Sequence, residues 1–347
     1  MLEIKTIQDY YELSPHHQSA ILKELKTKIR LEDWLRLQNE KRKRKRRLMV
    51  SSNIFLKRPE YVIEREDIVA KPRDGSDIHP SQIHKCVKKI WMDCSFIEMD
   101  VPVFQRDDSD GLVYDSNKEP VVVGTEKAMV PYYLLGEEYI DPRLQMIFDM
   151  GHAWHDKMQG YGARGAWGPK KNYRDEVAID PDEKDEQGNI VNPRAEQYWI
   201  KGAVDGVLDP YLINVSGLGK VAIRVLHEYK TINSNGYKNL SKPKSDHMWQ
   251  ATIYSMALDV PIVVYVYTNK DNCQLADFPV PFDRNLWAKI EAKIRKVQHY
   301  VEGHIVPPWE ETSAVLSPRE CMECPYVKLC QPPQSAVKKL TAQARRR

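Results

Sequence analysis

The sequence predicts an α/β fold in which a mixed central β-sheet is flanked by helices. The 347 residues are 42% hydrophobic and 29% charged, an ordinary composition for a globular protein with a buried core. The longest apolar run, Val260 to Tyr267, has eight residues, whereas a helix that crosses a bilayer needs roughly 18 to 20. Between Ser81 and His304, segments with helical and with strand-like apolar spacing alternate, and this order favours a mixed sheet with helices on its faces.

Residues 1–76 are predicted to form a helical, basic N-terminal extension and a linker. Apolar residues such as Ile21, Leu25 and Ile29 recur at helical spacing between positions 1 and 50. Pro72 to Pro80 is rich in residues that interrupt regular structure, so we expect a linker there. The main domain is predicted over residues 77–333, and a basic tail over residues 334–347.

The main domain is predicted to contain helices and strands in a definite order. Ser81 can cap a helix whose apolar face holds Ile83, Val87 and Ile90. Asp180 to Pro193 is polar and rich in turn residues, which indicates a loop between two strands. The elements expected along the chain are helix 81–94, helix 142–161, strands 172–179, 197–208 and 221–232, helix 246–258, strand 262–268 and helix 285–301.

Basic residues are concentrated in two segments. Ile21 to Leu48 has a net charge of +8 and Gln334 to Arg347 of +5, although the whole chain is only +3, so the remainder is at −10. An acidic body with basic extensions suits a protein that holds a polyanion at its periphery. A solvated helix end or a localisation-like patch is the alternative. The residues predicted to contact nucleic acid are Lys41, Arg42, Lys43, Arg44, Lys45, Arg46 and Arg47.

Two carboxylates and a lysine form the strongest catalytic candidate. Asp205 lies in Gly202-Ala-Val-Asp-Gly206, and Glu228-Tyr-Lys230 begins 23 residues after Asp205. Glu228 and Lys230 are two apart on a predicted strand, so both side chains point to one face. A hairpin of the two strands would bring Asp205 beside Glu228. Carboxylate oxygens bind Mg²⁺ or Mn²⁺, and a cation stabilises the charge that develops when a phosphodiester is attacked.

Two further motifs flank this group. Gly151-His-Ala-Trp-His155 precedes it and Gln250-Ala-Thr-Ile-Tyr254 follows it, each on a predicted helix. The order Gly-x-x-x-His, glycine-flanked aspartate, Glu-x-Lys and Gln-x-x-x-Tyr resembles the RecB-like branch of the PD-(D/E)XK nuclease superfamily. The resemblance covers roughly residues 78–332 and implies a restriction-endonuclease-like core. The long spacing from His155 to Asp205 and the unmatched N-terminal segment 1–75 depart from the family pattern.

The resemblance implies a role for each of these residues. His155, Asp205 and Glu228 would be ligands of Mg²⁺ or Mn²⁺, and the backbone carbonyl of Tyr229 would complete the metal shell. Lys230 would position or deprotonate the attacking water. Gln250 and Tyr254 would orient this lysine and the DNA phosphate.

Several single residues leave alternatives open. His152 is an alternative to His155 as the ligand, and Glu176 is a candidate carboxylate behind the metal ligands. Tyr254 could simply belong to the core. His227 is expected to be structural, because it faces the side of the strand opposite to Glu228.

Six cysteines are arranged as a C-terminal triplet and more distant residues. The N-terminus lacks the basic-then-apolar pattern of a signal peptide, so we expect the thiols to be reduced. Cys321, Cys324 and Cys330 form a Cys-x2-Cys-x5-Cys segment that offers three thiolates. A tetrahedral metal ion or a cubane cluster needs a fourth ligand.

This layout resembles the iron–sulfur segment of RecB-like nucleases of the AddB and CRISPR-associated types. The resemblance implies that Cys86 is the fourth ligand, so that a 4Fe-4S cluster joins both ends of the domain. Cys94 is the alternative fourth ligand, and Cys273 is expected to take no part. A zinc ion and free thiols are the alternatives to the cluster.

The motifs together predict a metal-dependent DNA nuclease, expected to be an exonuclease at DNA ends or in single strands for recombination, repair or phage DNA processing. The expected partners are DNA and a helicase, recombinase or integrase, with no membrane, in the cytoplasm of a bacterial, archaeal or phage-infected cell. The chain has no Gly-x4-Gly-Lys-[Ser/Thr] motif and hence no helicase motor of its own. The alternatives are a non-catalytic DNA-binding or recombination-accessory protein that retains the fold, and a zinc-stapled structural protein.

Overall fold

The computed structural model describes residues 1–25, 77–106, 112–115, 120–131, 142–308, 324 and 326–330, which belong to two compact units. In this part of the chain, the first unit contains residues 1–25, 79–84 and 142–294. The second contains residues 77–78, 85–106, 112–115, 120–131, 295–308, 324 and 326–330. The range 77–333, predicted to be one domain, is thus divided between both units, because part of it packs around a separate small core.

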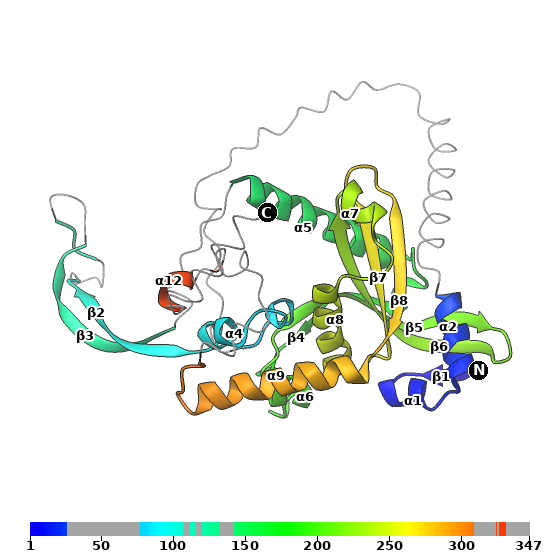
Figure 1. Cartoon of the computed structure of the whole chain (residues 1–347), viewed down its shortest axis with the longest axis horizontal. Coiled ribbons are helices and arrows are strands. Elements are labelled where there is room, and N and C mark those ends of the chain that lie inside the picture. Colours follow the sequence, from blue (N-terminus) through cyan, green and yellow to red (C-terminus); the bar gives the residue numbers. More distant parts are fainter. Residues whose placement is uncertain are drawn as a thin grey trace, which may run out of the picture. The chain divides into compact units, whose positions relative to one another are not determined.

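The first unit is built on a six-stranded mixed sheet, which confirms the predicted fold class (Figure 1). Its strands lie in the order β4-β5-β6-β7-β8, and β1 pairs with β6. β6 is parallel to β7 and to β1, whereas the other pairs are antiparallel. The strands are β1 (Leu2–Ile4), β4 (Tyr173–Ile179), β5 (Gly202–Val215), β6 (Gly219–Ile232), β7 (Ile262–Asn269) and β8 (Leu275–Pro281).

Helices lie against both faces of this sheet. Ile21 and Met158 pack with Tyr229 in one hydrophobic cluster, so α2 and α5 cover one face. Glu228 and Lys230 alternate with Tyr229 along β6 and therefore point to the other face, where Lys230 meets α8. The helices of this unit are α1 (Ile7–Tyr11), α2 (Pro15–Glu24), α5 (Pro142–Ala163), α6 (Pro193–Tyr198), α7 (Ser234–Lys238), α8 (Ser245–Leu258) and the part of α9 (Arg284–Glu302) up to Ile294, with 3₁₀ turns η2 (Pro80–Gln82) and η4 (Lys170–Asn172).

The N-terminal segment 1–25 is part of the first unit and not a helical extension of it. Leu2–Ile4 forms β1, which pairs with Val221 to Ile223 of β6. Ile4, Tyr10, Ile21 and Leu25 are all buried in the main hydrophobic cluster. Burial of these apolar side chains explains why the segment docks on the sheet. In this segment the helical prediction is correct for α1 and α2 and wrong for β1.

Two other elements begin later than the sequence predicts. The helix expected over residues 81–94 is divided into η2 and α4 (Val87–Asp93), because Cys86 acts as the N-cap and its Sγ accepts the Lys89 N–H at 3.2 Å. The strand expected from Gln197 starts at Gly202, since α6 runs to Tyr198 and Trp199 adopts a left-handed backbone conformation with φ 53°.

The second unit contains a two-stranded antiparallel ribbon and short helices. β2 (Phe96–Phe104) pairs with β3 (Val122–Pro131), and neither strand was predicted. The other helices are α4 and α12 (Val327–Cys330). Trp91, Met92 and Tyr326 form a small core, and the Tyr326 hydroxyl donates to Asp93 Oδ1 at 2.6 Å. These contacts bring the C-terminal segment against α4.

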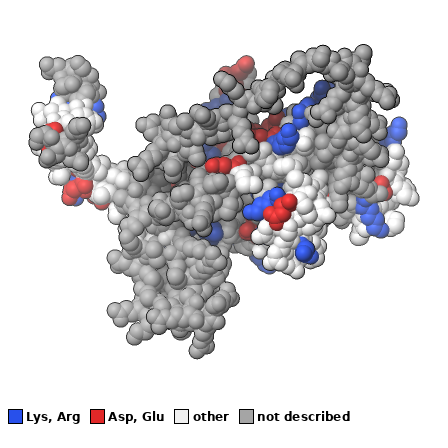
Figure 2. Space-filling model, turned by 90° about the horizontal axis from the view of Figure 1, so that it is seen from above, with Lys and Arg blue, Asp and Glu red and all other residues white. Residues whose placement is uncertain are grey.

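Charge is mixed on the one side of the described residues that the space-filling view presents (Figure 2). Figure 2 shows basic and acidic side chains interspersed on the face that it presents. The predicted nucleic-acid contacts Lys41 to Arg47, and the basic tail over residues 334–347, lie outside the described residues. Among the helices that are described, none combines the length and the apolar character that a bilayer span requires.

Candidate active site

Pairing of β5 with β6 brings Asp205 to the Glu228–Lys230 segment, as the sequence predicts. Gly206 lies opposite His227, and the Tyr229 N–H donates to Asp205 Oδ2 at 2.6 Å. Gly206 has a steric role here, because a Cβ at this position would lie only 2.4 Å from the Tyr173 hydroxyl oxygen. The absence of a side chain lets Tyr173 approach the strand and reach the Tyr229 hydroxyl at 3.0 Å.

α5 contributes His155 to the same place. Its Nδ1 lies 3.1 Å from Asp205 Oδ1, whereas His152 is exposed, so His155 is the histidine that meets the aspartate. Burial lowers the pKa of His155, but the hydrogen bond to Asp205 and its charge outweigh burial and raise the pKa overall. One turn later, Gln159 Nε2 donates to the Asp205 backbone carbonyl at 3.1 Å. Sequence reasoning missed Gln159, and its i+4 spacing from His155 is the signal that could have found it.

Glu228 and Lys230 form a buried ion pair in which one carboxylate oxygen of Glu228 has no hydrogen-bond partner among the described residues. Lys230 Nζ lies 2.6 Å from Glu228 Oε1, and Glu228 is 1% exposed. The other carboxylate oxygen, Oε2, is buried and has no hydrogen-bond partner among the described residues. Burial raises the pKa of Glu228 to about 7, although Lys230 opposes this shift. Burial lowers the pKa of Lys230, but the charges of Glu228 and Asp205 outweigh it, so the ammonium form is favoured.

α8 holds this lysine through a chain of two hydrogen bonds. Lys230 Nζ donates to Gln250 Oε1 at 3.3 Å, and Gln250 Nε2 donates to the Tyr254 hydroxyl at 3.3 Å. Gln250 and Tyr254 are one helical turn apart and therefore share a face of α8. Burial raises the pKa of Tyr254, so its hydroxyl stays protonated. Tyr254 is thus buried in the core, which was the alternative expectation for this residue, and it is also connected to Lys230 through Gln250.

The remaining sequence candidates lie around this group. His227 is fully buried on the opposite face of β6, where its ring packs 5.6 Å from Trp167 and 6.1 Å from Tyr229. Glu176 is exposed, and its backbone is left-handed with φ 43° where the β4–β5 register skips one residue, between Asp175 and Val177. The structure brings together six predicted side chains, namely His155, Asp205, Glu228, Lys230, Gln250 and Tyr254.

The metal-ligand arrangement itself is not assembled. Within the described ranges, no group of three or more His, Cys, Asp or Glu side chains is placed so that it could hold a metal ion. The reason is visible in the contacts: Glu228 Oε1 is paired with Lys230, and both Asp205 oxygens are engaged by His155 and the Tyr229 N–H. Of these four carboxylate oxygens, Glu228 Oε2 alone has no hydrogen-bond partner within the described ranges.

The described cysteines of the second unit lie on α4 and in the C-terminal segment. Cys86 is the N-cap of α4, and Cys324 packs against the cluster of Trp91, Met92 and Tyr326. Lys88 Nζ donates to the Cys330 carbonyl at 3.5 Å, so α12 also contacts α4. Cys321 lies outside the described residues.

The other two cysteines have different surroundings. The Cys94 thiol lies 3.5 Å from the Asp77 carbonyl, and burial raises its pKa. Cys273, in the first unit, is exposed in the turn between β7 and β8.

Comparisons with known proteins find similarity in structure alone. No protein-family model and no curated protein matches the sequence. The crystal structure of SSO0001 matches with a TM-score of 0.36 and 15% identity over 75% of this chain and 87% of that one. LHK-Exo in complex with dAMP matches with a TM-score of 0.32 and 16% identity over 50% of this chain and 75% of that one.

A second structure of the same enzyme, an alkaline exonuclease from Laribacter hongkongensis, has a TM-score of 0.32 and 12% identity over 66% of this chain and 90% of that one. Two of these structures are therefore of an exonuclease. Superposition at such TM-scores is too loose to assign a function.

Proposed function

We propose that this chain is a metal-dependent DNA nuclease, and specifically an exonuclease that hydrolyses phosphodiester bonds at DNA ends or in single strands. The observation that carries the proposal is the buried Glu228–Lys230 pair beside Asp205, in which one carboxylate oxygen has no partner among the described residues. A buried carboxylate oxygen without a donor is costly unless a proton or a cation meets it. An ion pair that only stabilised the fold would not need such an oxygen.

The donor set fits Mg²⁺ or Mn²⁺. Asp205 and Glu228 would supply carboxylate oxygens, and the Tyr229 carbonyl would supply a further oxygen, which are the ligands that hard cations prefer. His155 Nδ1 faces Asp205, so its Nε2 would be the ligand atom. When bound, the cation supplies positive charge that activates water and neutralises the phosphate. Glu228 Oε2, which has no hydrogen-bond partner among the described residues, would be the oxygen that meets the cation.

The protein's own groups then have separate tasks. Protonated Lys230 would donate to the attacking water or to a non-bridging phosphate oxygen, where negative charge develops. Gln250 accepts from Lys230 and is itself held by Tyr254, so the direction of the ammonium group is fixed. Gln159 and the Tyr229 N–H hold Asp205 from two sides. Such positioning avoids reorganisation during the reaction.

The iron–sulfur cluster is a separate proposal for the second unit. Cys86, Cys321, Cys324 and Cys330 would hold a 4Fe-4S cluster, and the packing of α12 and Tyr326 against α4 supports it. DNA would be held in addition by Lys41 to Arg47, which would make binding strongly dependent on salt.

The experiment is digestion of end-labelled single- and double-stranded DNA by anaerobically purified protein with Mn²⁺ or Mg²⁺. The proposal expects cleavage by the wild type that requires the metal ion and is absent in Lys230→Ala. Closed circular single-stranded DNA, resistant to an exonuclease, distinguishes exonuclease from endonuclease action. Binding without cleavage by folded wild-type protein would favour the non-catalytic accessory protein.

A further inference from the structure

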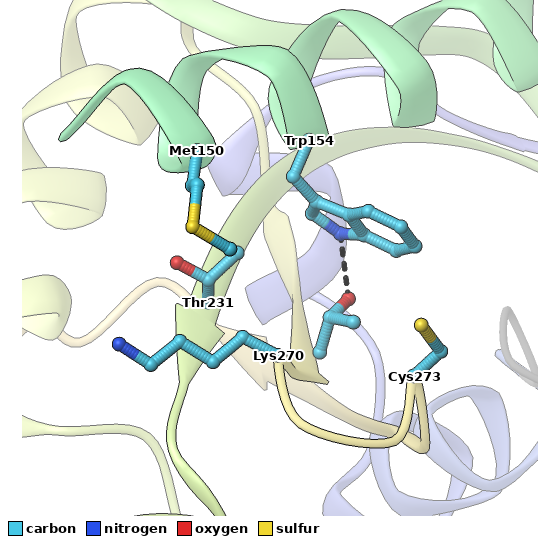
Figure 3. Close-up of a pocket in the computed structure, with 6 residues that line it drawn as sticks. Met150, Trp154, Thr231, Lys270 and Cys273 are labelled. Atoms are coloured by element: carbon cyan, nitrogen blue, oxygen red, sulfur yellow. Dashed lines mark hydrogen bonds between the residues drawn. The ribbon is translucent and has the colours of Figure 1, made fainter. Parts of the chain in front are cut away.

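A pocket of about 80 Å³ lies in the first unit beside the candidate active site. Figure 3 shows Met150 and Trp154 projecting from α5 toward Thr231 at the end of β6 and toward Lys270 and Cys273 in the β7–β8 turn. The six residues that line the pocket are Met150, Trp154, Thr231, Thr268, Lys270 and Cys273. None of them has a role in the catalytic group described above.

The inner part of the pocket is fixed and its rim is accessible. Trp154 Nε1 donates to Thr268 Oγ1 at 2.8 Å, the hydrogen bond drawn in Figure 3, and Thr268 is 1% exposed. Thr231 and Thr268 are register partners of the parallel β6–β7 pair. At the rim, Met150 is 60% exposed, and Lys270 and Cys273 are also exposed. A ligand can therefore enter from solvent and meet an indole ring whose position is set by a hydrogen bond.

The pocket adjoins the catalytic group on two separate elements. Trp154 directly precedes His155 on α5, and Thr231 directly follows Lys230 on β6. Neighbouring Cα atoms are about 3.8 Å apart, so on each of these two elements the backbone of a pocket residue directly adjoins that of a residue of the catalytic group. Adjacent strand residues point to opposite faces, so Thr231 lies on the face of β6 opposite to Lys230, and the pocket is separate from the Glu228–Lys230 pair.

The lining has the chemistry of a nucleotide site. An indole ring and a thioether offer stacking and polarizable contact to a base, since every base has a π-face. Lys270 offers a positive charge to a phosphate at the rim. A base inside a duplex is stacked on both sides and paired along its edge, so only an unpaired base could lie against the indole ring of Trp154 at the open side of the pocket.

We infer that this pocket binds the unpaired nucleotide next to the scissile phosphodiester of a DNA strand, with the base on Trp154 and Met150 and the flanking phosphate on Lys270. The inference rests on the proposed nuclease function and adds to it the residues that would hold an unpaired nucleotide. The enzyme would act on single-stranded DNA or on a frayed end, and duplex DNA would be cleaved only after its terminal pair opens.

The test measures the affinity for a short single-stranded oligonucleotide with Ca²⁺ in place of Mg²⁺, together with cleavage in Mn²⁺. Trp154→Ala should weaken binding by about tenfold or more, the effect of losing a stacked base, and Trp154→Phe should retain most of it. Met150→Glu and Lys270→Gln change exposed rim residues and keep the test valid if Trp154→Ala fails to fold. Lys220→Gln, an exposed lysine at the far end of β6, is the matched control.

A second readout uses Cys273 at the rim. In the wild type, the oligonucleotide should slow alkylation of Cys273, measured by peptide mass mapping, whereas blunt duplex should protect it less. Unchanged affinity and cleavage in all pocket variants, with no protection of Cys273, would overturn the pocket assignment and leave the nuclease proposal standing. Protection of Cys273 by a wild type that cleaves nothing would retain the nucleotide site and overturn the proposed function.

Discussion

Binding of Mn²⁺ should become about tenfold tighter between about pH 6 and about pH 8. The pKa of Glu228 is raised to about 7 by burial, so its charged fraction rises from about one-tenth to about nine-tenths over this range. Proton and cation compete for the same carboxylate, and removal of the proton therefore strengthens metal binding. The gain corresponds to about 1.4 kcal/mol of binding free energy. The raised pKa of His155 acts in the same direction, because imidazolium cannot be a ligand.

Isothermal titration calorimetry checks this directly. In buffers that differ in protonation enthalpy, each Mn²⁺ bound near pH 7 should release about half a proton from Glu228. Glu228→Gln should lose most of the affinity and its pH dependence, whereas Glu183→Gln, an exposed carboxylate in the loop between β4 and α6, should behave as wild type. An affinity that is the same at both pH values, with no proton release, would refute the assignment of Glu228 as a ligand.

Three further predictions concern other parts of the chain. Gln250→Ala should lower kcat by about tenfold to a hundredfold through loss of lysine positioning; Tyr254→Phe should cost less, and the double variant should match Gln250→Ala, because one chain of hydrogen bonds is involved. Equal activity of the two single variants and the double variant would contradict a role for this chain of hydrogen bonds. Cys324→Ala should lose bound iron and sulfide in elemental analysis while Cys273→Ala retains them, and zinc or no metal in the wild type would exclude the cluster. Replacing Lys41 to Arg47 by glutamine should reduce the slope of log affinity against log salt for single strands by roughly 0.7 for each phosphate that the segment no longer neutralises, and an unchanged slope would exclude this segment from DNA binding.

Much of the first unit can be predicted from local patterns. The alternation of Glu228, Tyr229 and Lys230 shows which side chains share a face of β6. The glycine-flanked Asp205 indicates that its strand, β5, is the hairpin partner of β6. The helical spacing of Gln250 and Tyr254 places both on one face of α8. These relations depend on residues close in sequence and on two strongly apolar strands, which is why they hold in the structure.

Other features depend on packing that no local pattern contains. The short strand β1 forms because β6, which is distant in the sequence, supplies its pairing partner. β8 contains Pro279 and Pro281, which argue against a strand in sequence terms but are tolerated at the edge of a sheet. The lone oxygen of Glu228 and the pocket beside Trp154 arise from the meeting of several elements.

The most direct measurement of the central claim is single-turnover cleavage of end-labelled single-stranded DNA in Mn²⁺ by wild type, Lys230→Ala and the control Lys220→Ala, with folding verified by circular dichroism. Loss of label is expected with wild type and with Lys220→Ala, and no loss with Lys230→Ala at equal DNA binding. Cleavage by Lys230→Ala at the wild-type rate would contradict the claim that the Glu228–Lys230 pair is the catalytic centre.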